Sequence, residues 1–187
     1  VAAQTHAEEW LVRQARQQLQ QRTAAGKAMA ETHAALRKLF ETSGNPHHRL
    51  RALWGLGVTG GADAQWLRGL LEHDDEHVRV WSVRLLGQEM MIAPETVAAL
   101  SEVAEGETSG LVLLHIASAL QRIPVGERWD VAAALGTHGE FAADPALPLM
   151  VWYGIESAVS ESPERAVSLA ANARIPLLTQ FIARRLT

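Results

Sequence analysis

The amino-acid sequence predicts an all-α protein, an α-solenoid of about five two-helix repeats (an α–α superhelix). Three observations support this fold class. Apolar residues recur at helical spacing through almost the whole chain, and no segment keeps a strand-like alternation for long. Residues that start and stop helices separate these segments. One pattern, clearest in HVRVWSVRLLG at residues 77–87, returns at roughly regular intervals, as expected for a repeat protein.

The predicted helices follow one another from end to end, about eleven in all. Their expected ranges are 5–22, 27–42, 46–57, 64–73, 76–88, 94–106, 111–123, 126–137, 145–159, 163–173 and 175–186. Thr5 and Glu8 have the spacing of a capping box for the first helix. Asn45, Asp63, Asp74 or Asp75, and Ser109 are expected N-caps. Prolines at 46, 94, 145, 163 and 176 suit the first turn of a helix, and Pro148 is tolerated only there.

The repeat is defined by the second helix of each pair. Its first apolar position, here called position zero, falls at His48, Val78, Val112, Leu147 and Ile175. Position +8 is Leu56, Leu86, Leu120, Ile155 and Ala183, and position +2 is aliphatic every time. One helix pair cannot bury its own apolar face, so each pair must pack on the next.

Composition limits the classes of function. A hydrophobic content of 48% argues against disorder, and a net charge of −4 argues against binding that depends on neutralising phosphates. The absence of cysteine removes disulfides, thiolate nucleophiles and cysteine-ligated metal sites. No run of apolar residues is long enough for a membrane span, so no membrane insertion is expected. Both ends are expected to be cut from a longer chain.

Two motifs resemble chemical sites but have simpler explanations. Residues 55–60, GLGVTG, fit G-x-G-x-x-G, yet they end a helix rather than joining a strand to a helix, so a turn is expected. Residues 73–77, HDDEH, span a helix end and a helix start, where Asp is explained by capping. No catalytic group, metal site, cofactor or small-molecule ligand is therefore predicted.

The second helices offer a candidate partner surface. Positions +3, +6 and +10 share a face, and second helices usually line the concave side of such a stack. Tryptophan, tyrosine and arginine dominate binding hot spots. The predicted partner-binding residues on this face are Arg51, Trp54, Trp81, Arg84, His115, Arg122 and Tyr153. For most of the six tryptophans, packing between repeats is the alternative role.

A repeated arginine stands at position +1, as Arg49 and Arg79. We expect it to be structural and to pair with the acidic turn of a neighbouring repeat, such as Asp74 and Asp75.

The pattern of residues 48–57 and 77–87 resembles HEAT-like repeats of the phycobilisome-lyase type. The phrases LRALWGLGVTGG, EHVRVWSVRLLG, RWDVAAAL and DPALPLMVWYGIE are similar to the HEAT segments of large multidomain proteins from planctomycete and verrucomicrobial bacteria. Those proteins carry a propeller described as a putative membrane-bound dehydrogenase, and a haem-binding domain of cytochrome-c type. The resemblance covers essentially the whole chain and implies a periplasmic or secreted location.

These observations predict one HEAT-like repeat domain over residues 1–187, a segment of a larger protein. It is expected to be a non-catalytic scaffold that binds protein and links the propeller to the haem domain. Two alternatives remain open. HEAT-like DNA glycosylases grip duplex DNA with aromatic and basic residues, for which the net charge of −4 is unfavourable. The resemblance of the repeats to those of phycobilin lyases gives the second alternative, a chromophore-lyase-like protein.

Overall fold

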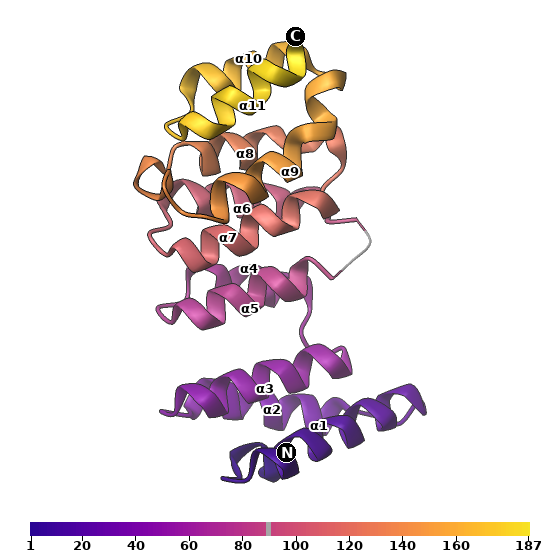
Figure 1. The fold of residues 1–187 in the computed structure, drawn as a ribbon. Coiled ribbons are helices and arrows are strands. Elements are labelled where there is room, and N and C mark those ends of the chain that lie inside the picture. Colours follow the sequence, from indigo (N-terminus) through magenta and orange to yellow (C-terminus); the bar gives the residue numbers. More distant parts are fainter. Residues whose placement is uncertain (89–90) are drawn as a thin grey trace. The chain divides into compact units, whose positions relative to one another are not determined.

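The computed structural model describes residues 1–88 and 91–187, and within these ranges the regular structure is entirely helical (Figure 1). The chain forms two compact units, Val1–Trp66 and Leu67–Thr187. The predicted all-α solenoid class with HEAT-like helix pairs is confirmed. The prediction of a single domain over residues 1–187 stays a prediction.

The first unit contains a 3₁₀ turn and three complete α-helices. They are η1 (Ala2–Thr5), α1 (Glu9–Ala24), α2 (Ala30–Thr42) and α3 (Pro46–Thr59). The start of α3 follows the prediction: the Asn45 side chain accepts a hydrogen bond from the His47 amide, and Pro46 occupies the first turn. Gly60 ends the helix with φ of 73°, a conformation that favours glycine. Helix α4 (Ala64–Gly69) crosses from the first unit into the second.

The second unit is a double layer of helices. Each second helix packs on the next second helix, and from Pro94 onward each first helix packs on the next first helix (Figure 1). The first layer has η2 (Leu70–Glu72), α6 (Pro94–Gly106), α8 (Trp129–Gly136) and α10 (Pro163–Asn172). The second layer has α5 (Glu76–Leu86), α7 (Gly110–Ala119), α9 (Leu147–Glu161) and α11 (Pro176–Leu186). Short 3₁₀ turns η3 (Leu120–Arg122), η4 (Val125–Glu127) and η5 (Gly139–Phe141) join them.

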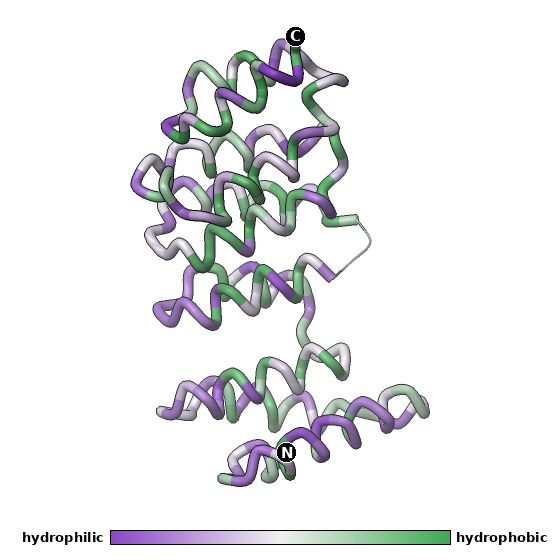
Figure 2. Tube along the Cα trace, in the orientation of Figure 1, coloured by the Kyte–Doolittle hydropathy of each residue, from purple (hydrophilic) through white to green (hydrophobic). Residues whose placement is uncertain are grey.

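The core of the second unit follows the repeat. Position zero is fully buried at Val78, Val112, Leu147 and Ile175, and position +8 is buried at Leu86, Leu120 and Ile155. Figure 2 shows the corresponding alternation of apolar and polar residues along the helices. Position +8 in the last helix is the exposed Ala183, so the match weakens at that repeat.

Most predicted helix starts are confirmed, but four are wrong. The helix expected from Lys27 begins at Ala30. The Thr5 hydroxyl donates to the Ala2 carbonyl instead of capping a helix, so α1 begins at Glu9. The predicted helix 126–137 begins at Trp129, because η4 occupies the residues before it. The helix expected from Pro145 begins two residues later, as α9 at Leu147, with Pro148 in its first turn. Before it, Asp144 Oδ1 accepts hydrogen bonds from the amides of Ala146 and Leu147.

Candidate functional site

Three of the seven predicted partner-binding residues line one hollow in the second unit. We call it the α5–α7 groove; it has a volume of about 480 Å³. It is lined by Val83, Arg84, Gly87, Gln88, His115, Ser118, Ala119 and Arg122. The groove lies where the C-terminal ends of α5 and α7 run side by side. Among these eight residues there are two arginines and one histidine, and none is acidic.

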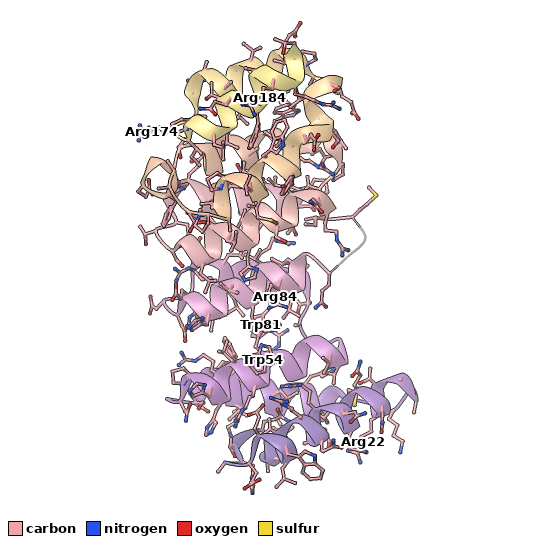
Figure 3. The ribbon with its side chains drawn as sticks, viewed as in Figure 1. Arg22, Trp54, Trp81, Arg84, Arg174 and Arg184 are labelled. Atoms are coloured by element: carbon pink, nitrogen blue, oxygen red, sulfur yellow. The ribbon has the colours of Figure 1, made fainter. Side chains whose placement is uncertain are left out.

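Trp81 adjoins the groove through Arg84. The Arg84 guanidinium lies 4.2 Å from the centre of the half-buried Trp81 ring, and Figure 3 shows the two side chains together on α5. This stacking restricts the arginine while leaving it exposed to solvent. A guanidinium held in this way loses less rotational freedom when it binds an anion.

Arg122 is held by its backbone. Its carbonyl accepts from the Ile92 amide, while the carbonyls of the two flanking residues, Gln121 and Ile123, accept from the Arg128 side chain. Arg128 is 9% exposed and also donates to the Gly154 carbonyl at 2.8 Å, which joins this turn to α9. No motif or repeat position in the sequence marks Arg128. Its only local signal is its place beside the buried Trp129, at the start of an apolar helix.

The first unit holds the predicted residues Arg51 and Trp54. The Arg51 side chain is 14% exposed, forms an ion pair with Glu9 at 2.6 Å and donates to the carbonyls of Gln4 and His6. These contacts join residues 4–9 to α3. The Trp54 ring is half-buried, with the Arg16 guanidinium 5.2 Å from its centre. Partner binding by these two residues stays a prediction.

The remaining aromatic residues divide between core and surface. Trp129 and Trp152 are buried, and the Trp152 ring packs on Phe181. Trp66 is half-buried beside Phe40. Tyr153, the last predicted partner-binding residue, is 52% exposed on α9 and outside the lining of the α5–α7 groove. Trp10 is also exposed.

The repeated arginine is structural, and Arg79 pairs with the acidic turn of the next repeat as expected, but the carboxylate is Glu107 and not Asp74 or Asp75. Arg79 donates to the backbone carbonyls of His73 and Asp74, not to the carboxylates of Asp74 and Asp75. Its charge is matched by Glu107, through two contacts of 2.8 Å. Arg49 donates to the Ser43 carbonyl. The loop before the next second helix thus supplies the carboxylate, so the predicted contact between neighbouring repeats is present with a different acidic residue.

The two chemical motifs have structural roles. Residues 55–60 form the end of α3 and its turn, as predicted. In the HDDEH segment, Asp75 caps α5 by accepting from the His77 amide, and His73 Nδ1 accepts from the Asp75 amide. In the ranges 1–88 and 91–187, no three histidine, aspartate or glutamate side chains are placed to hold a metal ion. None of the helices described there could cross a membrane.

We expect a histidine titration to report on the electrostatics of the groove. Burial, together with the nearby Arg84 charge, holds the pKa of His115 below its ordinary value of 6.5. The folded protein therefore loses stability as the pH falls below about 6.5, because the unfolded chain binds the proton more readily.

Arg84→Gln should raise the pKa of His115, measured by NMR of the imidazole. Arg165→Gln, a change on α10, should leave it unchanged. A wild-type pKa at or above 6.5 would contradict this description of the groove.

The comparison with known families agrees with the geometry. Residues 33–121, which run from α2 to η3, match the family model for HEAT repeats. No curated protein and no solved structure matches the chain. HEAT repeats suggest a scaffold or protein-interaction role for this segment.

Proposed function

We propose that the chain is a non-catalytic scaffold that binds a protein partner along its second helices. The α5–α7 groove carries this proposal, since it combines Arg84, His115 and Arg122 within the segment of HEAT repeats and its immediate end. Arginine beside exposed aromatic surface is a common composition of protein-binding sites.

The charge distribution of the second unit favours protein over nucleic acid as the partner. A hollow of about 640 Å³ on the first layer is lined by Glu102, Glu105, Glu127 and Asp130. Duplex binding depends on neutralising many phosphates, whereas the eight residues that line the groove include two arginines and no lysine. The net charge of −4 opposes that as well.

Site-specific photo-crosslinking tests the binding surface. A benzoyl-phenylalanine in place of Tyr153 on α9 should form an adduct with a defined protein in the cells that produce this chain. The matched control is Val167 on α10, which is similarly exposed at 56% but lies in the other layer. Equal crosslinking from both positions, or none from either, would remove the support for a second-helix binding surface.

A finer proposal rests on the sequence resemblance. The segment would link a dehydrogenase-like propeller to a cytochrome-c-type haem domain in a periplasmic or secreted protein. Sequencing the reading frame on both sides tests it directly: a signal peptide and propeller upstream and a Cys-x-x-Cys-His motif downstream are expected. Stop codons close to both ends would end the linker proposal and leave the scaffold proposal standing.

The two alternative functions have simple tests of their own. Labelled duplex DNA at low salt should show no binding by fluorescence polarisation if the scaffold proposal holds. A bilin titrated with the protein should keep its free absorbance spectrum. Tight, salt-sensitive DNA binding would favour a nucleic-acid function, and a shifted bilin spectrum would favour a chromophore-lyase relationship.

A further inference from the structure

We infer that the α5–α7 groove binds an acidic peptide segment of the partner, with Arg84 and Arg122 contacting its carboxylates. This inference rests on the proposed protein-binding function and names the chemistry of the partner. The two arginines are exposed, line the same hollow and belong to different helix pairs. An extended segment carrying two or more carboxylates can therefore contact both, through charge-assisted hydrogen bonds.

The backbone carbonyls beside the groove do not cancel this attraction. Helix C-termini carry partial negative charge, which by itself repels an anion. At the end of α5, the carbonyls of Val83 and Leu85 accept from the amides of Gly87 and Gln88. At the end of α7, the carbonyls of residues 121–123 accept from Arg128 and the Ile92 amide. These five carbonyls therefore have donors already, which weakens their repulsion of an anion, and the two guanidinium groups remain for a ligand.

The Arg84 side chain and the backbone of Arg122 are positioned before any ligand arrives. Trp81 restricts the guanidinium of Arg84 by stacking, and the buried Arg128 fixes the turn that carries Arg122. Prior positioning lowers the entropic cost of binding. Gln88 and Ser118, both exposed, add neutral polar groups to the same hollow.

Part of the lining of the groove consists of small residues. It includes Gly87 and the small side chain of Ala119, and a Cβ added at Gly87 would lie 3.9 Å from that of Ala119. An extended peptide can lie over small residues while its longer acidic side chains reach the arginines on either side. The groove therefore suits a segment rich in aspartate or glutamate better than a bulky folded surface.

The experiment uses a fluorescein-labelled peptide with six consecutive glutamates between Gly-Ser flanks. Its binding to the 187-residue chain is measured by fluorescence polarisation at 50 mM and 150 mM salt. The same peptide with glutamines is the uncharged probe. The double variant Arg84→Gln/Arg122→Gln is compared with Arg165→Gln/Arg174→Gln. The control changes the net charge equally in the same unit, at one position on α10 and one in the loop that follows it.

We expect the groove variant to lose at least tenfold in affinity and the control variant less than twofold. The glutamine peptide should not bind. On the wild-type protein, NMR shifts on adding the glutamate peptide should concentrate at His115, Ser118 and Gln88, a readout that needs no variant to fold. Equal losses in both variants, shifts spread over the surface, or no binding at millimolar peptide would overturn the inference.

Two further outcomes separate this inference from the function on which it rests. If single-stranded DNA of equal charge binds the groove more tightly than the peptide, the groove is a phosphate site and the acidic-peptide inference fails. If Tyr153 crosslinks a protein partner but the glutamate peptide does not bind, the scaffold function stands and the inference alone fails.

Discussion

Glu107→Ala is expected to lower the free energy of unfolding by about 3 kcal/mol, because it breaks a largely buried ion pair from one side. The Glu107 side chain is 4% exposed and accepts from Arg79 Nε and Nη2 as well as from the amides of Thr108 and Ser109. Without the carboxylate, the half-buried guanidinium and both amides lose their acceptor. Chemical denaturation followed by circular dichroism measures the effect.

The pH dependence of the same variant gives an independent check. Burial acts to raise the pKa of Glu107, but hydrogen bonds from Arg79 and Ser109 outweigh it and hold the pKa below its ordinary value of 4.5. The stabilisation is thus complete above about pH 4.5 and is lost as the pH falls through the lowered pKa. The wild-type protein and the variant should converge in acid. Glu105→Ala, at an exposed position on α6, is the control and should change stability little. A difference that persists unchanged in acid would contradict this account.

Arg128→Met is expected to lower the free energy of unfolding by about 2 to 3 kcal/mol, because buried acceptors lose charged donors. Arg128 donates to the carbonyls of Ile123 and Gly154 at 2.8 Å and to the Ser157 hydroxyl at 3.2 Å. Methionine keeps much of the volume but supplies no donor. Thermal and denaturant unfolding should both report the loss.

A lysine at the same position separates charge from geometry. Arg128→Lys keeps the positive charge but lacks the planar fork that reaches several acceptors, so we expect it to recover less than half of the lost stability. Arg165→Met is the control, since the exposed Arg165 makes a single contact, to the Gly126 carbonyl. Full recovery with lysine would mean that charge alone matters at this position.

Much of the fold could be predicted because helix boundaries depend on nearby residues. The Asn45 cap, the Asp75 cap and the proline at the start of α6 act within a few positions of themselves. Thr5 shows the limit of such reasoning. Its hydroxyl has a local acceptor in the Ala2 carbonyl, and a pattern of residue types does not indicate which of two local partners is preferred.

The contacts between repeats could not be predicted in the same way. Arg79 and Glu107 are 28 positions apart, and Arg128 reaches Gly154 over 26 positions. The repeat predicts that Arg79 pairs with an acidic turn of a neighbouring repeat but does not identify Glu107, and no pattern indicates the contacts of Arg128. Of the proposed surface, the sequence identified Arg84, His115 and Arg122 through their shared helical face, and the structure places these three around one hollow. Arg51 has the same helical position as His115, yet it is engaged with the N-terminal segment, which no periodicity reveals.

The long-range contacts also bear on how the second unit unfolds. Arg79 joins α5 to the loop before α7, His138 Nε2 meets the Ala104 carbonyl of α6, and Arg128 joins the start of α8 to α9. In a linear array, cooperativity grows with the energy of coupling between neighbours relative to the stability of each member. These hydrogen bonds and ion pairs between helix pairs add coupling energy that a purely apolar interface would lack. Opening one helix pair therefore weakens the next, and the unit should melt as a single block instead of fraying pair by pair.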